Sequence, residues 1–171
     1  GDYLSFPASS ILNFGADVFT VDGFVRPGAI GSMQGLVEGR GSTAAVACSF
    51  FIDIKADGKL EALASATNAG SSGTWAVILT SSAALVSGTA YHFEISRGAG
   101  NVWRMFIDGI QVSTTTVNIT VGSPAATGYI ATGVSSAGVL GYTLTGRMKD
   151  VRITKGVCRH TSNFTPPTSP F

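Results

Sequence analysis

Residues 91–112 read YHFEISRGAGNVWRMFIDGIQV, and this stretch decides the fold. In residues 91–97 apolar and polar side chains alternate, which is typical of a strand with one face in a core. We therefore assign Phe93 to the core and His92 to a solvated polar face. The pair Asp108-Gly109 suits a type I′ turn, because both of its central residues need a positive φ. Trp103 shares the parity of apolar neighbours, so we assign it to the core as well.

The same period of two continues on both sides of this stretch. FTVDGFV (19–25) alternates in the same way, and Asp57-Gly58 signals a second hairpin. Gly and Ser clusters punctuate the chain, and no helical period is present. The pattern predicts an all-β fold, a two-sheet antiparallel sandwich. The expected strands cover residues 3–6, 18–26, 35–38, 45–55, 60–65, 75–79, 90–97, 102–107, 111–117, 126–132 and 142–154.

Length and composition exclude several classes of protein. The 171 residues fit one domain, which we place at residues 2–171. Only 12% of residues are charged and the net charge is +1, without a basic block, so no nucleic-acid partner is expected. The basic residues of 146–160 alternate with apolar ones and indicate a half-exposed strand. No apolar run is long enough for membrane insertion, and residues 1–10 do not resemble a signal peptide.

Two further features concern side chains that could stabilise the domain. Cys48 and Cys158 both lie in apolar surroundings, which favours two buried free thiols, with a disulfide as the alternative. The ending TSNFTPPTSPF (161–171) holds three prolines and cannot be a central strand. We expect it to form a clasp that is anchored by Phe164 and Phe171 and covers a sheet edge.

Three blocks of the sequence resemble one family. They are YLSFPAS…FGADVFTVDGFVRP (3–27), YHFEISRGAGNVWRMFIDGIQV (91–112) and GYTLTGRMKDVRITKGVCRHTSNFTPPTSPF (141–171). Together they resemble concanavalin A-like (laminin G-like) domains, and the last block resembles the version found in tailed-phage and prophage virion proteins. The chain departs from the usual pattern at Phe24, where Trp is common, and at Cys158 and His160, which stand for Ala and Tyr.

The resemblance implies a concanavalin A-like jelly roll and a virion or extracellular location. Because this fold carries lectins, glucanases and adhesion modules, two functions stay open. One is a virion-associated module that recognises a bacterial surface polysaccharide as part of a phage tail, fibre or decoration protein. The other is a structural module that docks to other virion proteins or forms a homo-oligomer, such as a trimer, without binding sugar.

Catalysis has little support in the residues. A glycosidase needs two carboxyl groups about 5–9 Å apart, and the candidates here are Asp53, Asp57 and Glu94. Asp57 belongs to a turn, and the carboxylate spacing of glucanases on this fold is missing. The sequence also lacks the GxSxG motif that carries the nucleophilic serine of many hydrolases. We therefore expect no enzyme activity.

A sugar site needs an aromatic platform and a few polar groups. Trp75 follows the Gly- and Ser-rich loop 68–74 and is the candidate platform, although a core position is the alternative. The candidate polar residues are carried by loops: Asn68, Ser71, Ser72 and Asn101.

A calcium ion is a further candidate ligand, because the resembled domains often carry one at the rim of the sandwich. Asp17, Asp22, Asp108 and Asp150 supply suitable oxygens. Only Asp108 and Asp150 match recurrent acids of the family. Each has a structural alternative, since Asp108 makes a turn and Asp150 can pair with Arg152.

Overall fold

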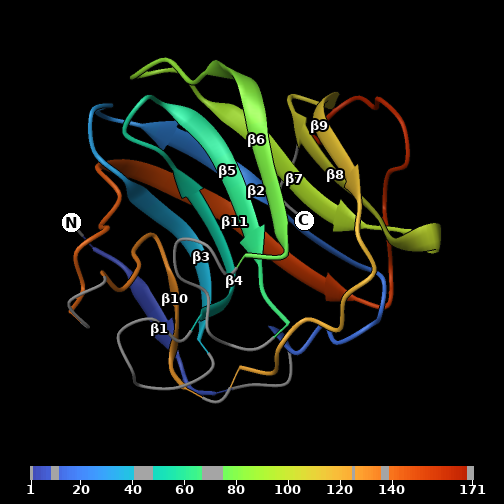
Figure 1. The fold of residues 1–171 in the computed structure, drawn as a ribbon. Coiled ribbons are helices and arrows are strands. Elements are labelled where there is room, and N and C mark those ends of the chain that lie inside the picture. Colours follow the sequence, from blue (N-terminus) through green and yellow to red (C-terminus); the bar gives the residue numbers. More distant parts are fainter. Residues whose placement is uncertain are drawn as a thin grey trace.

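Two antiparallel sheets pack face to face in the computed structural model, which describes residues 2–8, 12–40, 48–66, 75–124, 126–135 and 139–168 (Figure 1). The six-stranded sheet has the order β1 (Leu4–Phe6), β10 (Gly128–Ile130), β3 (Gln34–Arg40), β4 (Cys48–Ile54), β5 (Lys59–Ala64) and β6 (Val77–Ala84). The five-stranded sheet has the order β11 (Gly146–Lys155), β2 (Phe19–Pro27), β7 (Tyr91–Arg97), β8 (Val102–Ile107) and β9 (Ile110–Thr116). The all-β sandwich and its expected strands are confirmed, with strand ends shifted by a few residues.

Aromatic side chains fill the space between the sheets. The rings of Phe14 and Phe19 stack at 3.9 Å, and Phe50 meets both of them edge-on. Trp103 is 1% exposed and packs edge-on against Phe19. Its indole N–H donates to the carbonyl of Val117 at 3.0 Å, so burial leaves no donor unpaired. The core assignment of Trp103 is confirmed.

The Asp-Gly hairpin between β8 and β9 forms as expected. Asp108 and Gly109 have φ values of 50° and 76°, the two positive angles of a type I′ turn. The Asp108 carboxylate also accepts the backbone N–H of His92 at 2.8 Å. The carboxylate therefore ties the turn to β7, and its role in the fold is structural.

Residues 157–168, the C-terminal strap, leave β11 and run beside β8 and β9 (Figure 1). The N–H of Phe164 donates to the carbonyl of Gly109 at 2.9 Å, and Asn163 Oδ1 accepts the N–H of Gln111 at the same distance. The Phe164 ring stacks on His160 at 3.5 Å and meets Phe106 edge-on. The expected clasp is present with Phe164 as an anchor. It crosses the outward face of the five-stranded sheet and reaches the edge strand β9 at Gln111, and Phe171 lies outside the described residues.

Coverage by the strap changes the environment of one sheet face. Asp22, His92 and Glu94 point away from the core, yet each is at most 1% exposed. The expectation that His92 is solvated is therefore wrong. Alternation correctly placed His92 on the polar face, but a segment far along the chain folds back over that face and excludes water.

The remaining expectations on stability and location concern the thiols and the membrane. Cys48 and Cys158 are both free, so the unpaired state is confirmed. Cys48 is buried as expected, whereas Cys158, which is part of the strap, is half-buried. Strand β11 is exposed at Gly146, Arg147, Lys149 and Lys155 and half-buried at its other positions, which confirms the half-exposed strand expected near residue 150. Among the described residues, no helix has the length and apolar character that a membrane crossing requires.

Replacing Phe164 by Ala should destabilise the domain. The ring is only partly buried, so we expect the free energy of unfolding to fall by about 1–3 kcal/mol. For a domain of this size each kcal/mol shifts the melting temperature by roughly 2–4 °C, which thermal unfolding followed by circular dichroism measures. Ile110→Ala, at a 54% exposed position, is the control. A Phe164→Ala variant that melts with the parent would show that the strap contributes nothing to stability.

Candidate functional site

The outward face of the six-stranded sheet carries two rows of side chains that cross β4, β5 and β6. One row pairs Asp53 with Glu61 and Glu61 with Thr80. The neighbouring row pairs Phe51 with Leu63 and Leu63 with Ile78. Because alternate residues of β4 fill the core, apolar side chains stand on both of its faces. Apolar side chains on both faces indicate that the outward face either packs against another part of the chain or contacts a ligand.

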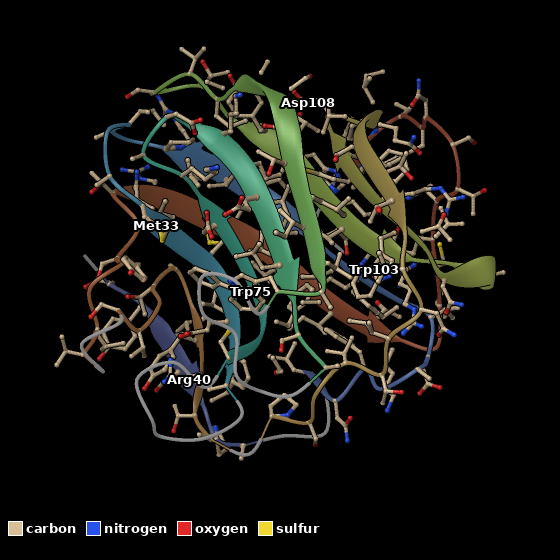
Figure 2. The ribbon with its side chains drawn as sticks, viewed as in Figure 1. Met33, Arg40, Trp75, Trp103 and Asp108 are labelled. Carbon is tan, nitrogen blue, oxygen red and sulfur yellow. The ribbon has the colours of Figure 1, made fainter. Side chains whose placement is uncertain are left out.

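An apolar cluster, here called the Trp75 cluster, covers the second row. It comprises Met33, Cys48, Phe51, Leu63, Trp75 and Tyr142. Figure 2 shows Met33 and Trp75 along the six-stranded sheet. Cys48, Phe51 and Leu63 are buried, whereas Met33, Trp75 and Tyr142 are only partly buried. The partly exposed indole therefore rests on a packed base and can offer a face to a ligand.

A buried ion pair borders the Trp75 cluster. Arg40 Nη1 donates to Glu38 Oε1 at 2.9 Å, and both side chains are less than 5% exposed. The N–H of Val134 donates to the other carboxylate oxygen at 3.1 Å. Burial raises the pKa of Glu38, and the Arg40 guanidinium opposes that shift. Burial also raises the pKa of the adjacent Cys48 thiol, and the Glu38 carboxylate adds to the effect, so this thiol is unreactive.

Asp53 is the most perturbed acid on this face. Burial raises its pKa to about 8, the neighbouring Glu61 carboxylate adds to the shift, and Lys55 opposes it. Neither carboxyl oxygen has a hydrogen-bond partner among the described residues. Glu61 itself lies 3.5 Å from Lys55 Nζ and accepts the Thr80 hydroxyl at 3.2 Å. Asp53 is thus a neutral acid at neutral pH beside an ion-paired carboxylate.

A protonated carboxyl group beside a second carboxylate is an arrangement that glycosidases use. Asp53, however, is completely buried and cannot contact a sugar in this conformation. The third acid considered from the sequence, Glu94, lies on the other sheet. The three acids Asp53, Asp57 and Glu94 are therefore not brought together into one cleft.

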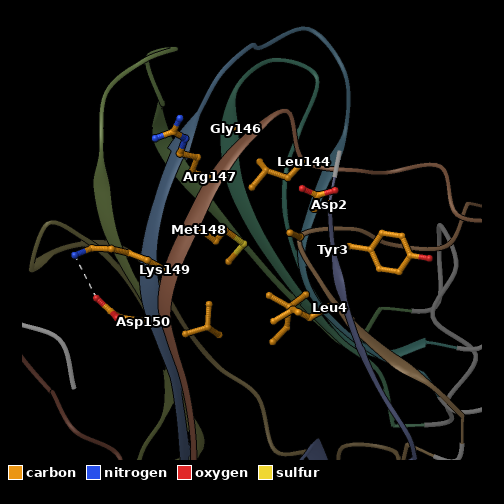
Figure 3. A pocket seen from close by; sticks show the side chains of 12 residues that line it. Asp2, Tyr3, Leu4, Leu144, Gly146, Arg147, Met148, Lys149 and Asp150 are labelled. Carbon is orange, nitrogen blue, oxygen red and sulfur yellow. Dashed lines mark ion pairs between the residues drawn. The ribbon is translucent and has the colours of Figure 1, made fainter.

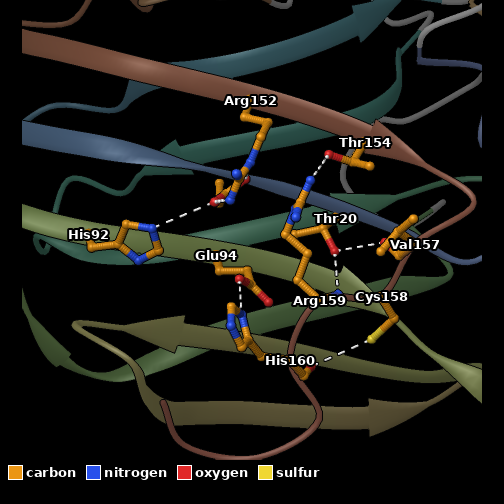
Figure 4. Close-up of polar contacts among 10 residues, drawn as sticks. Thr20, His92, Glu94, Arg152, Thr154, Val157, Cys158, Arg159 and His160 are labelled. Carbon is orange, nitrogen blue, oxygen red and sulfur yellow. Dashed lines mark hydrogen bonds and ion pairs between the residues drawn. The ribbon is translucent and has the colours of Figure 1, made fainter. Parts of the chain in front are cut away.

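A polar network lies beneath the C-terminal strap (Figure 4). Arg152 donates through Nε and Nη2 to the two oxygens of Asp22, at 3.0 and 2.6 Å. His92 Nε2 lies 3.7 Å from the same carboxylate. His160 Nδ1, on the strap, lies 2.7 Å from Glu94 Oε2. Each buried acid of this face therefore has a cationic or imidazole partner that comes from a distant part of the chain.

The two acids of this network respond differently to their surroundings. Burial alone would raise the pKa of Asp22, but the nearby His92 and Arg152 outweigh it, so its pKa is lowered. Burial raises the pKa of Glu94, and the contact with His160 only partly offsets that effect. Asp22 is accordingly the ionised partner of Arg152, while Glu94 holds a proton more readily than an exposed glutamate.

The described residues proposed for sugar binding, Trp75 and Asn101, lie beside different sheets of the sandwich. Trp75 lies just before β6 and packs against the Trp75 cluster as a partly buried side chain, and its role as a sugar platform stays a prediction. Asn68, Ser71 and Ser72 fall outside the described residues. Asn101 lies between β7 and β8 of the other sheet, where its side chain accepts a hydrogen bond from Arg97. No finding tests whether any of these residues binds a ligand.

The acids proposed for calcium lie in separate elements. Asp108 occupies the β8–β9 turn and bonds to His92, as its structural alternative implied. Asp150 contacts Lys149 Nζ at 3.3 Å, and Arg152 pairs with Asp22, so the expected Asp150–Arg152 pair is wrong. Asp17 pairs with Lys155 at 3.4 Å. Within the described ranges no three His, Cys, Asp or Glu side chains gather as metal ligands, and calcium binding stays a prediction.

Sequence reasoning missed several residues of this face. Met33 comes from a segment without a strand pattern, so no periodicity pointed to it, and Tyr142 was expected to begin a strand but lies in the loop before β11. Glu38 and Arg40 share parity in β3, and this was an available signal, because two charged residues two apart point to the same side of a strand. Phe51 in CSFFIDI was a second signal, since an aromatic residue opposite a core face usually meets a partner.

Replacing Asp53 by Asn should raise stability more at alkaline than at acid pH. Well below pH 4 the carboxyl is protonated in both the folded and unfolded states, and the substitution changes little. As the pH rises toward about 8 the unfolded carboxyl ionises while the folded one stays neutral, so the parent loses stability and the variant does not. The gain should reach the order of a few kcal/mol by pH 8. Urea unfolding at pH 4 and pH 8 measures it, with Asp17→Asn as the exposed control. A gain that is equal at both pH values would contradict a buried neutral acid.

Comparison with known proteins identifies the fold family. The family model described as the concanavalin A-like lectin/glucanases superfamily matches residues 1–161. No curated protein matches the sequence. Among solved structures, the CBM40 of Ruminococcus gnavus IT-sialidase bound to α2,3 sialyllactose superposes with a TM-score of 0.68 at 12% identity, covering 86% of this chain and 80% of that chain.

Two further solved structures share the architecture. A heptameric SAP-like pentraxin from Limulus polyphemus has a TM-score of 0.57 at 16% identity, covering 88% of this chain and 74% of that chain. Domain 4 of the arabinanase AbnA from Geobacillus stearothermophilus, in complex with arabinotriose, has a TM-score of 0.56 at 16% identity, covering 85% of this chain and 64% of that chain. At such identities the likeness shows the fold alone. Because the family match spans nearly the whole described sandwich, the chain belongs to the concanavalin A-like lectin/glucanase superfamily.

Proposed function

We propose that this domain is a non-catalytic module that binds a cell-surface glycan on the outward face of its six-stranded sheet. The observation that carries the proposal is the Trp75 cluster, in which a partly exposed indole rests on buried Phe51 and Leu63. A sugar ring presents an apolar C–H face that stacks on such an aromatic platform, and polar groups beside the platform fix its orientation.

A buried ion pair beside Cys48 and Phe51 holds the base of the platform rigid. Glu38 and Arg40 hold each other at 2.9 Å in a buried setting, and the N–H of Val134 fixes the second carboxylate oxygen. Tyr142 contributes a second partly buried ring, centred 6.3 Å from that of Phe51. A rigid aromatic surface beside fixed polar groups loses little entropy on binding, which favours affinity for a ligand as weakly apolar as a sugar.

The fold family supports a glycan as the ligand. Two of the similar structures were solved with saccharides, sialyllactose in the sialidase module and arabinotriose in the arabinanase domain. The resemblance of residues 141–171 to phage virion proteins supports the narrower part of the proposal. In it the module belongs to a tail, fibre or decoration protein, is located on the virion or outside the cell, and recognises a bacterial surface polysaccharide.

The contacts of the titratable groups support a non-catalytic role. Asp53 is closed off from a substrate. Cys158 and His160 lie close together, but the thiol contacts the backbone carbonyl of His160 at 3.5 Å. The His160 imidazole instead contacts Glu94. A nucleophile needs its base within hydrogen-bond reach, and this pair does not provide that contact.

Binding of the isolated domain to an array of bacterial surface polysaccharides tests the proposal. We expect selective binding by the parent, and about a tenfold loss for Trp75→Ala, which corresponds to about 1.4 kcal/mol, because the substitution removes the aromatic platform on which the sugar ring would stack. Tyr3→Ala removes a 44% exposed ring on the edge strand and serves as the matched control.

Two outcomes would contradict the proposal. If the folded parent binds no polysaccharide on the array, the proposal of a glycan ligand is wrong. If Trp75→Ala and Tyr3→Ala lose the same amount of binding, the proposal that the site lies at Trp75 is wrong. Melting curves of all three proteins confirm that the variants are folded, so a loss of binding is not a loss of structure.

A second candidate function, an assembly module, has one specific observation in its favour. A cleft of about 500 Å³ opens between β1 and β11, where Leu4, Leu144 and Met148 approach one another (Figure 3). Tyr3 and Leu4 beside it are 44% and 67% exposed. Exposed apolar residues next to an apolar cleft are typical of contact surfaces, so this edge could dock to a second copy of the chain or to another virion protein.

Sedimentation equilibrium over a hundredfold range of concentration distinguishes the two functions. If the module assembles, the parent forms a trimer and Leu4→Ser dissociates it, because a polar side chain at the cleft disfavours apolar contact. If the module acts only by binding glycan, both proteins stay monomeric and Leu4→Ser binds the array like the parent.

A further inference from the structure

We propose that a cleft between β11 and the C-terminal strap binds an oxyanion. The cleft has a volume of about 480 Å³, and its walls include Arg152, Arg159, His160 and Thr165. No acidic residue lines it among the described residues. It lies on the five-stranded sheet, so it is separate from the glycan face proposed above and does not depend on it.

Arg159 supplies the positive charge that this proposal requires. Its side chain is exposed, and its guanidinium donates to the hydroxyl of Thr154 at 3.1 Å. No carboxylate of a described residue pairs with it. The backbone is fixed as well, because the Arg159 N–H donates to Thr20 Oγ1 at 3.0 Å and that hydroxyl donates to the Val157 carbonyl at 2.9 Å. An unpaired guanidinium is therefore held at the mouth of the cleft.

Arg152 and His160 are oriented from behind by buried acids (Figure 4). Asp22 accepts Arg152 Nε and Nη2, while Arg152 keeps 27% of its side chain exposed. Glu94 contacts His160 Nδ1, and His160 keeps 33% of its side chain exposed. The opposite imidazole nitrogen, Nε2, has no hydrogen-bond partner among the described residues. The Arg152 guanidinium and the His160 imidazole are thus both positioned before any ligand arrives, which lowers the entropy lost on binding.

These donors match a group with several negative oxygens. Guanidinium N–H groups bind carboxylate and phosphate strongly, through charge-assisted hydrogen bonds. The Thr165 hydroxyl, on the strap side of the cleft, adds a neutral donor. The occupant is therefore an oxyanion, either free inorganic phosphate or the carboxylate of an acidic saccharide.

Titration of the isotope-labelled domain with inorganic phosphate at constant ionic strength tests the site. We expect saturable NMR shifts at the amides of Arg159 and His160. Arg159→Gln should weaken binding about tenfold, and Arg159→Lys, which keeps the charge but loses the fork of donors, should weaken it less. Arg147→Gln removes the same charge from an exposed position outside the cleft and should bind phosphate like the parent.

The source of the anion is resolved by two further titrants. Glucuronate should shift the same amides if an acidic saccharide is the occupant, whereas phosphate alone should do so if the site is a phosphate site, and neutral glucose should not shift them in either case. Thr165→Val, which leaves the charge intact, should weaken binding a few-fold and keeps the test open if Arg159→Gln fails to fold. The proposal is overturned if no saturable shift occurs, or if Arg159→Gln and Arg147→Gln weaken binding equally.

Discussion

The contact between Glu94 and His160 is the constraint on which the placement of the C-terminal strap depends. Glu94 stands on β7, the central strand of the five-stranded sheet, and is completely buried. Burying a carboxyl group without a partner costs several kcal/mol. His160 Nδ1 provides the partner at 2.7 Å and brings Phe164 onto Phe106. The strap is therefore needed by the sheet, and the sheet in turn orders the strap.

This mutual dependence gives the two sheets different outward faces. The strap and Arg152 close the polar face of the five-stranded sheet and leave an Arg- and His-lined cleft at its border. The six-stranded sheet keeps a partly exposed indole above a buried base. One chain thus presents an aromatic surface on one side and a cationic cleft on the other, and the two surfaces favour ligands of different chemistry.

The sequence was sufficient for features that depend on neighbouring residues. Period-two alternation found the strands, and Asp108-Gly109 found the hairpin, because both signals are local. It was insufficient for the environment of His92, since exposure depends on residues far along the chain. Glu94 and His160 are 66 positions apart, and Asp22 and Arg152 are 130 apart. The same limit applies to the Trp75 cluster, where Tyr142 joins residues of β4 and β5 from the loop before β11, far along the chain.

The strap is a long-range element that the sequence did predict, because its prolines and Phe164 indicated an ordered segment packed on the sandwich. Pro166 and Pro167 restrict the unfolded chain, so ordering this segment costs less entropy. The strap covers the face as well as reaching the edge strand β9, because Glu94 lies on the central strand and its partner His160 comes from the strap. Alternation could place Asp22 and Glu94 together on that face, but it could not show which segment would cover them.

Amide hydrogen exchange of the intact domain tests most directly whether the strap is part of the folded unit. The Phe164 N–H donates to the Gly109 carbonyl at 2.9 Å and reports on the strap, while the amides of β7 report on the sheet beneath. If the strap and sheet are mutually dependent, the Phe164 amide exchanges as slowly as the β7 amides, through global unfolding. Fast exchange at Phe164 with β7 still protected would show that the strap opens on its own and would contradict the account.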